Sequence, residues 1–197
     1  MSVSAQQSGD TRYQPPEVRR QQILSAAARL AAEDGLEGTS MATVAETAGV
    51  AKGSIYLHFT SRDDLIEALQ AQVWAEMMEV PRLIAIDKGL PWVERLDAIV
   101  EHWIRYEFEH HDLYHAVFHE VATDSKEPWS EARELLRQIV AGGVVSGEFD
   151  CGGLDTHVVV DFLLHGYAGP CYHDARVEAL IADMQRLFRR TVGATGA

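Results

Sequence analysis

The chain has 197 residues, of which 47% are apolar and 24% charged, a composition typical of a globular protein that is long enough to bury a core. Acidic residues outnumber basic ones by 30 to 17, and the net charge is −13 at pH 7. This charge excludes a generic polybasic nucleic-acid coat and disfavours attraction to anionic membranes. Two cysteines form no disulfide framework and no CxxC pair, which favours a reducing compartment.

Residues 1–15 are rich in Ser and Gln and lack the apolar segment of a secretory signal, so we expect a disordered tail. No stretch reaches the roughly 18 apolar residues that a membrane helix needs. Because no export or anchor signal is visible, we expect a cytoplasmic protein that does not bind membranes.

Apolar residues recur at helical spacing almost throughout, and no convincing alternating strand is present. We therefore expect an all-α protein. The first predicted helices cover residues 16–34, 41–48, 52–59 and 61–80. Beyond Pro81 the predicted helices lengthen, and they cover residues 92–110, 112–121, 129–146, 154–168 and 172–191.

Local signals mark the ends of the first helices. Gly35 is a fitting stop for the helix that begins at residue 16. Ser40 or Thr39 can cap the next one. Ser61, followed by Asp64 three residues later, resembles a capping box and predicts the start of a longer helix.

The two short helices are joined by Ala48-Gly49-Val50 and have the size of a helix-turn-helix, whose second helix can enter the major groove of DNA. Gly53 is a poor helix former, which suits a backbone that must come close to another molecule. Several side chains of this second helix can donate hydrogen bonds to phosphates or base edges: Lys52, Ser54, Tyr56 and His58.

Three stretches, TSMATVA at 39–45, AGVAKGSIYLHF at 48–59 and RDDL at 62–65, together resemble the DNA-binding segment of the TetR/AcrR regulators. The resemblance implies a three-helix DNA-binding head followed by a helical-bundle body that binds a ligand and dimerises. It implies DNA contacts, mostly to the backbone, at five positions: Thr39, Thr43, Lys52, Tyr56 and His58.

The same resemblance places Gly53 and Ser54 on the groove-facing part of the recognition helix, and Arg62 where a basic residue tends to sit. We expect these three residues to belong to the DNA-binding surface as well. We accordingly expect a helix-turn-helix domain over residues 16–62 and a ligand-binding and dimerisation domain over 63–197. Residues 12–62 carry six basic and five acidic residues, so the acid excess lies outside them. So few cations predict a weak dependence of DNA affinity on salt.

The aromatic residues of the second domain can line a mostly apolar pocket with a few polar groups, the usual form of a small-molecule site. The sequence identifies no cofactor and no particular effector. The candidates for contact with a ligand are Trp103, Tyr106, His115, Phe118, His119, Phe162 and His165.

Eight of the nine histidines lie beyond residue 81, and some of them recur every four residues. His115 and His119 share one helical face, as do Asp161 and His165. If two such faces meet, these four side chains form a metal or haem site. The alternative is that they line an organic-ligand cavity or face solvent.

The resemblance implies that the last two helices pair with those of a second copy. A homodimer presents two recognition helices to an inverted-repeat operator in double-stranded DNA. We expect a ligand-responsive regulator, a repressor that a small molecule releases, with the helix at 61–80 as the lever between body and head. The alternatives are a metal- or haem-sensing repressor and a helical adaptor without DNA binding. No nucleophile, P-loop, HExxH or dinucleotide motif indicates an enzyme.

Overall fold

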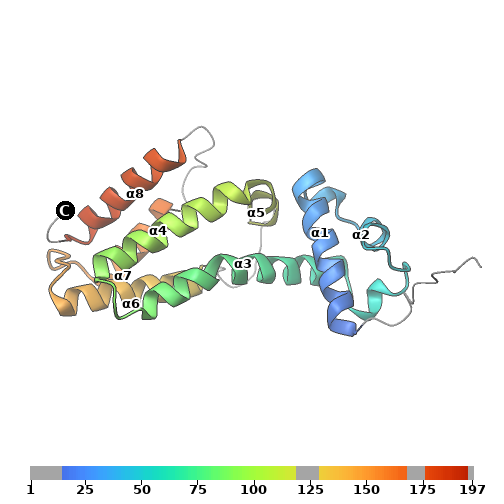
Figure 1. Ribbon diagram of the computed structural model, residues 1–197, viewed down its shortest axis with the longest axis horizontal. Coiled ribbons are helices and arrows are strands. Elements are labelled where there is room, and N and C mark those ends of the chain that lie inside the picture. Colours follow the sequence, from blue (N-terminus) through green and yellow to red (C-terminus); the bar gives the residue numbers. More distant parts are fainter. Residues whose placement is uncertain (1–14, 119–128, 168–175, 195–197) are drawn as a thin grey trace, which may run out of the picture. The chain divides into compact units, whose positions relative to one another are not determined.

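The computed structural model describes residues 15–118, 129–167 and 176–194 (Figure 1). These residues form eight α-helices and one 3-10 turn, and their only β-type pairing is an isolated bridge between Phe149 and Ala194. The prediction of an all-α protein is confirmed. The predicted tail lies outside the described residues except for Pro15.

The chain divides into two compact units. Unit 1 contains the residues up to Gln70 and a segment that begins at His115, and unit 2 contains the remainder. The predicted domain boundary between residues 62 and 63 stays a prediction.

Unit 1 is built from α1 (Pro16–Gly38), α2 (Met41–Thr47), the 3-10 turn η1 (Ile55–Leu57) and the first part of α3 (Arg62–Ile86). Helices α1 and α2 pack against each other. Each of the four elements, together with the short segment between η1 and α3, contributes buried apolar side chains, among them Ile23, Leu24, Ala27, Val44, Ala45, Ile55, Phe59, Leu65 and Leu69.

The ends of α1 and α2 follow the predicted signals. Gly35 has φ 67° and ψ −178°, so regular helical geometry breaks at the predicted stop, in a conformation that suits glycine. Ser40, rather than Thr39, caps α2. The Ser40 Oγ accepts from the Thr43 backbone N–H at 3.1 Å, and the Thr43 Oγ1 accepts from the Ser40 N–H at 3.0 Å.

The prediction of an α-helix over residues 52–59 is wrong. The segment contains a single 3-10 turn, Ile55–Leu57, and residues 52–54 form a turn before it. The backbone N–H of Ser54 bonds to Ala51 O and that of Leu57 to Ser54 O, which is 3-10 spacing. Gly53 and Ser54 have low helix propensity, so the short segment does not gain a regular α-helix.

The predicted end of the next helix near residue 80 is also wrong, because α3 continues through Pro81 to Ile86. A proline inside a helix removes a backbone hydrogen bond and normally ends or kinks it. Here Pro81 is buried, and the following Arg82 binds Glu131 of α6, with 2.6 Å between Nε and Oε1. Tertiary contacts thus hold the turn that follows the proline.

Unit 2 contains the rest of α3 and the helices α4 (Trp92–Glu109), α6 (Ser130–Ser146), α7 (Thr156–Tyr167) and α8 (Val177–Thr191). The short α5 (His111–Phe118) begins in unit 2 and ends in unit 1. Helix α4 packs against α8 and α6, and α6 packs against α7. The predicted helices at 92–110, 129–146 and 154–168 agree with α4, α6 and α7 to within two residues, whereas α8 begins later than predicted.

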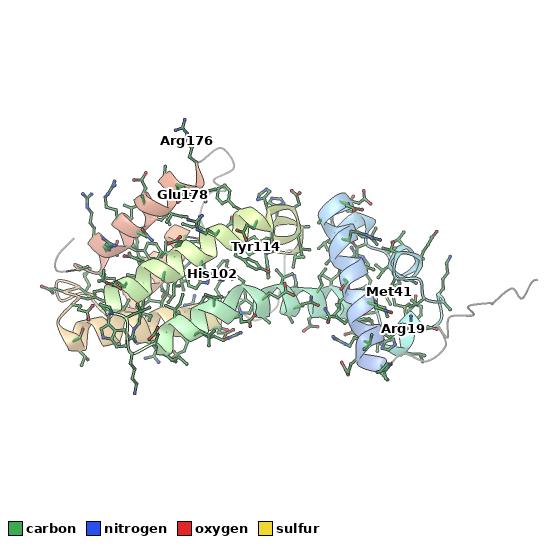
Figure 2. The ribbon with its side chains drawn as sticks, in the orientation of Figure 1. Arg19, Met41, His102, Tyr114, Arg176 and Glu178 are labelled. Atoms are coloured by element: carbon green, nitrogen blue, oxygen red, sulfur yellow. The ribbon has the colours of Figure 1, made fainter. Side chains whose placement is uncertain are left out.

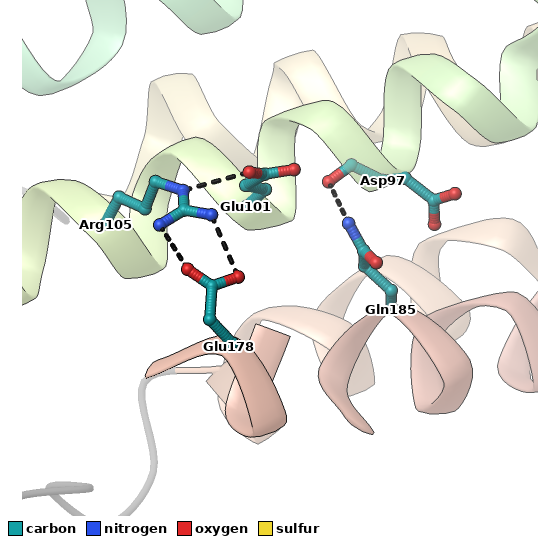
Figure 3. A network of polar contacts seen from close by, with 5 residues as sticks. All are labelled: Asp97, Glu101, Arg105, Glu178 and Gln185. Carbon is teal, nitrogen blue, oxygen red and sulfur yellow. Dashed lines mark hydrogen bonds and ion pairs between the residues drawn. The ribbon is translucent and has the colours of Figure 1, made fainter. Parts of the chain in front are cut away.

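Polar contacts near both of its ends hold helix α8 against α4, and Figure 3 shows those made by Glu178 and Gln185. Near its start, Arg105 of α4 binds both oxygens of Glu178, at 2.9 and 3.1 Å, and also binds Glu101. Near its other end, Arg189 binds the largely buried carboxylate of Asp97. Between the two, Gln185 donates to the Asp97 carbonyl oxygen. None of the described helices is long and apolar enough to cross a membrane.

Candidate DNA-binding surface and effector site

The segment from α2 to η1 presents polar groups above a buried apolar layer. Val44, Ile55 and Phe59 are fully buried beneath it. Because these anchors lie between the polar positions in the sequence, they fix the backbone that carries them. Of the predicted DNA contacts, the exposed ones are Thr43, Lys52, Gly53, Tyr56 and Arg62, and the half-buried ones are Ser54 and His58.

Tyr56 is the largest of these exposed groups, at 56% exposure, and its neighbour Leu57 is 83% exposed. The Tyr56 ring and the Leu57 isobutyl group are exposed to solvent, so neither belongs to the core of unit 1. A phenol can donate to a phosphate, and an apolar group can contact a thymine methyl. Leu57 was not singled out from the sequence, because the helix predicted over 52–59 gave no reason to place it outside.

Thr39 is not available for a partner. Its side chain is fully buried, and its Oγ1 donates to the carbonyl oxygen of Gly35 at 3.1 Å. It therefore stabilises the end of α1.

Arg62 also has an internal role. Its Nε donates to the Thr39 carbonyl oxygen and its Nη2 to that of Leu36. Lys52 and Arg62 are the only Lys or Arg residues between positions 39 and 62. Because Arg62 is engaged at these carbonyls, Lys52 is the cation of this segment that is best placed to meet a phosphate.

A second cation, Arg20, stabilises the head through a contact with an aromatic ring. The guanidinium of Arg20 on α1 lies 4.8 Å from the centroid of the Phe59 ring, a cation–π contact. No sequence pattern predicts this pair, because the two residues are far apart in the chain and each is an ordinary member of its segment.

Unit 2 holds a cluster of aromatic rings that spans several helices. The Trp103 ring of α4 lies 5.5 Å from that of Tyr167 on α7, and Tyr167 lies 6.2 Å from Trp129. Trp129 in turn meets Trp74 of α3 edge-on at 5.5 Å. These four residues are called the aromatic cluster below. The prediction named Trp103 alone among them as a ligand contact.

Most polar atoms around the aromatic cluster have identified protein partners. Trp74 Nε1 donates to Glu131 at 3.0 Å, and the Tyr167 hydroxyl donates to Glu107 at 3.1 Å. The exception is Trp103, whose buried Nε1 has no hydrogen-bond partner in the described part of the chain.

Other titratable groups of unit 2 are strongly affected by burial. Burial raises the pKa of Tyr106 to about 12, and its hydroxyl donates to the Val73 carbonyl oxygen at 3.2 Å. Burial likewise raises the pKa of Tyr114 and lowers that of His102. Figure 2 shows His102 between α3 and α4, where its Nε2 lies 3.1 Å from the carbonyl oxygen of Met77. A carbonyl only accepts, so Nε2 carries the proton.

The other predicted ligand contacts are less enclosed. Phe162 is 66% exposed, and His165 is exposed with its Nδ1 2.7 Å from the Asp161 carbonyl oxygen. His115 and Phe118 are half-buried in the part of α5 that belongs to unit 1. His119 lies outside the described residues.

The predicted metal site gains no support from the described ligands. Arg133 Nε binds the Asp161 carboxylate at 2.8 Å, which satisfies one of the proposed donors. Within residues 15–118, 129–167 and 176–194, no group of three or more His, Cys, Asp or Glu side chains could hold a metal ion. The set that includes His119 stays a prediction.

Exposed apolar side chains gather on the last two helices and the residues that lead into them. Leu154, Val158 and Phe162 are each more than 60% exposed and are spaced four residues apart. That spacing puts Val158 and Phe162 on one face of α7, and Leu154 lies in the residues that lead into the helix. On α8, Leu187 is 56% exposed.

Comparison with known proteins places these features in a family. Residues 23–69 match the family model described as bacterial regulatory proteins, tetR family. The chain is 30% identical over 165 residues to the HTH-type transcriptional repressor AcnR of Corynebacterium glutamicum, which covers 83% of this chain and 79% of that protein. It is 29% identical over 155 residues to the repressor KstR2 of Rhodococcus jostii, covering 74% of each.

The fold also matches solved structures. The transcriptional regulator FadR of Bacillus subtilis, determined in complex with stearoyl-CoA, superposes with a TM-score of 0.68 and 22% identity, covering 87% of this chain and 98% of that one. At this identity the likeness concerns the fold alone.

Proposed function

This chain belongs to the tetR family of bacterial regulatory proteins, and from that premise we propose that it is a repressor that binds an inverted-repeat operator as a homodimer and is released by a small molecule. The single observation that carries the proposal is the head surface, where Thr43, Lys52 and Tyr56 stand exposed on a fully buried apolar base. Groups of this kind donate to phosphates and base edges.

In this proposal DNA recognition rests on Lys52, Tyr56 and the backbone at Gly53, with Thr43, Ser54 and His58 beside them. The Thr43 hydroxyl already donates inside the head, to the carbonyl oxygen of Gly38 or Ser40. Thr39 and Arg62 hold the end of α1 and do not read DNA. The head therefore binds largely through neutral donors and a single well-placed cation, and its affinity depends only weakly on salt.

Dimerisation is supported by the exposed apolar residues on α7 and α8. Leu154, Val158 and Phe162 form a continuous stripe that a single copy leaves in water. A contiguous apolar surface of this kind marks an interaction site in a soluble protein. A second copy that packs α7 and α8 against the same helices covers it symmetrically.

The effector site in this proposal is the aromatic cluster of unit 2. Its rings supply the apolar wall, and a few buried polar groups supply orientation, which is the usual form of a small-molecule site. FadR of Bacillus subtilis, which has the same fold, was solved in complex with stearoyl-CoA, so a protein of this fold can bind a ligand that carries a long apolar chain. Helix α3, which runs from unit 1 into unit 2 along the chain, is the element through which we expect the ligand to act.

Fluorescence anisotropy with a labelled random-sequence duplex at low salt tests the proposal against a helical adaptor. We expect measurable binding that weakens with salt with a slope near that of one or two phosphate contacts per head. Absence of binding at the lowest salt would favour the adaptor. Native mass spectrometry of the same sample is expected to show a dimer, and any added mass identifies the effector class.

A further inference from the structure

The indole N–H of Trp103 stands out among the buried polar groups of unit 2. Trp103 has no measurable exposure, and its Nε1 is the only buried side-chain nitrogen or oxygen without a hydrogen-bond partner in the described residues. The great majority of buried donors in folded proteins are satisfied, and an exception calls for a physical explanation. An indole N–H only donates, so a suitable partner must supply an acceptor.

Other polar groups of the aromatic cluster have protein acceptors, unlike the Trp103 N–H. Trp74 uses its own indole N–H on Glu131, and Tyr167, which packs on the Trp103 ring, uses its hydroxyl on Glu107. The donors of these two neighbouring rings are thus each satisfied by a glutamate of the protein. At Trp103 the surroundings supply aromatic surface without an acceptor.

The charges at the aromatic cluster limit what the acceptor can be. Two carboxylates, those of Glu107 and Glu131, bind polar atoms of its rings, and Glu131 is already paired with Arg82. An anionic ligand would meet the charge of Glu107 beside Tyr167. A cationic group would be attracted to Glu107, but an ammonium has no lone pair with which to accept from an indole.

We propose that Trp103 is the residue that selects the effector: its indole N–H donates to the carbonyl oxygen of a neutral, largely apolar ligand that packs on the aromatic cluster. This inference rests on the proposed function in placing the effector site in unit 2. It adds the chemical class of the ligand and the atom that recognises it. In the free protein the unsatisfied donor is destabilising, and a ligand that supplies an acceptor removes this destabilisation when it binds. A ligand without an acceptor does not, which makes such a site selective.

The first test needs no ligand. Trp103 is replaced by 3-benzothienylalanine, which keeps the two-ring shape and exchanges the N–H for sulfur, and the same replacement at Trp74 is the matched control. We expect the urea midpoint to fall for the Trp74 replacement, which loses its bond to Glu131, and to stay or rise for the Trp103 replacement. An equal fall at both positions would show that the Trp103 N–H is already bonded, and would overturn the proposal.

The second test uses benzophenone and diphenylmethane, which differ in the carbonyl oxygen. Titration calorimetry on the full chain is expected to show about tenfold tighter binding of benzophenone, the range of one hydrogen bond that rescues a buried donor. The preference is expected to vanish in the Trp103 replacement and in Trp103→Phe. The same preference in all three proteins, or no binding of either compound to the unaltered chain, would contradict the proposal.

Neither test involves DNA. A chain that fails to bind any operator but shows both effects would refute the proposed function and leave the Trp103 site intact. A chain that binds its operator but shows neither effect would refute the Trp103 site and leave the proposed function intact.

Discussion

Arg62 donates from its Nε to the carbonyl oxygen of Thr39 at 3.0 Å, so the first residue of α3 holds the turn that joins α1 to α2. The last carbonyls of a helix lack partners within it, and Arg62 supplies one from another element. A position where the family resemblance implied a contact with DNA is thus occupied by a side chain that stabilises the head itself.

We expect Arg62→Gln to lower the free energy of unfolding by about 1–2 kcal/mol, because two carbonyls lose charge-assisted partners. The slope of log affinity against log salt is expected to stay unchanged. Lys52→Gln is the matched control, and it is expected to lower that slope by about one per head, or about two for the dimer, while stability changes by less than about 0.5 kcal/mol. Equal loss of slope in both variants would show that Arg62 binds a phosphate after all. Urea unfolding and anisotropy over a salt series measure the two quantities.

The ion pair between Asp97 and Arg189 is expected to matter more for stability than the other contacts of α8. The Asp97 side chain is 11% exposed and that of Arg189 37%. Removing one partner of a largely buried pair leaves the other without compensation, so we expect Asp97→Ala to cost about 2–4 kcal/mol.

Arg186→Gln is the control for that experiment. It breaks the exposed pair with Asp183 on the same helix, and such pairs contribute about 0.5 kcal/mol or less. If urea unfolding gives both variants the same small loss, then α8 does not depend on Asp97 for its attachment to α4.

We expect Phe162→Asp to convert the dimer to a monomer, because a charge placed on the apolar stripe of α7 would be buried without a partner at the interface. Phe162 is 66% exposed in a single copy, so the change leaves the fold of that copy intact. Leu83→Asp on α3, at a position 62% exposed, is the control that should stay dimeric. Sedimentation equilibrium decides between them, and a Phe162→Asp dimer of unchanged affinity would move the interface elsewhere.

The stability of unit 2 is expected to depend on pH through His102. Burial lowers the pKa of His102 in the folded state, although the Met77 carbonyl and the charge of Glu109 oppose the shift. As pH falls, His102 therefore takes up a proton more readily in the unfolded chain than in the folded one. The stability contributed by neutral His102 is lost as pH falls below the ordinary histidine pKa of about 6.5.

His102→Gln tests this dependence. An amide N–H can replace the donor to Met77 and does not titrate. We expect the loss of unfolding free energy between neutral and mildly acidic pH to be smaller in the variant than in the unaltered chain. Identical pH profiles would mean that His102 keeps an ordinary pKa and that other groups cause the dependence.

The sequence was most informative where a local signal acts alone. Gly35 breaks α1 and a serine caps α2 because left-handed geometry and a free helix N-terminus each demand one kind of residue. Prediction from the sequence was wrong where contacts between residues that are distant in the chain determine the structure. The continuation of α3 past Pro81 depends on Arg82 meeting Glu131, which no local pattern reveals.

The candidate sites divide in the same way. Lys52 and Tyr56 were identified as exposed donors from residue type and spacing, and the structure presents both. The internal bonds of Arg62 depend on partners more than twenty residues away, and the unsatisfied N–H of Trp103 depends on what several helices fail to provide. A lack of partners is a property of the assembled fold, so no sequence pattern could have shown it.

Selection of bound duplexes from a random DNA pool, followed by sequencing, determines whether the chain is a dimeric regulator that recognises a specific DNA sequence. We expect an enriched inverted repeat with half-site centres about one helical turn apart or slightly more. Lys52→Gln is expected to select the same repeat with lower affinity, because a phosphate contact carries no sequence information. A pool that yields no motif, or a single unpaired half-site, would contradict a dimeric repressor that reads DNA through this head.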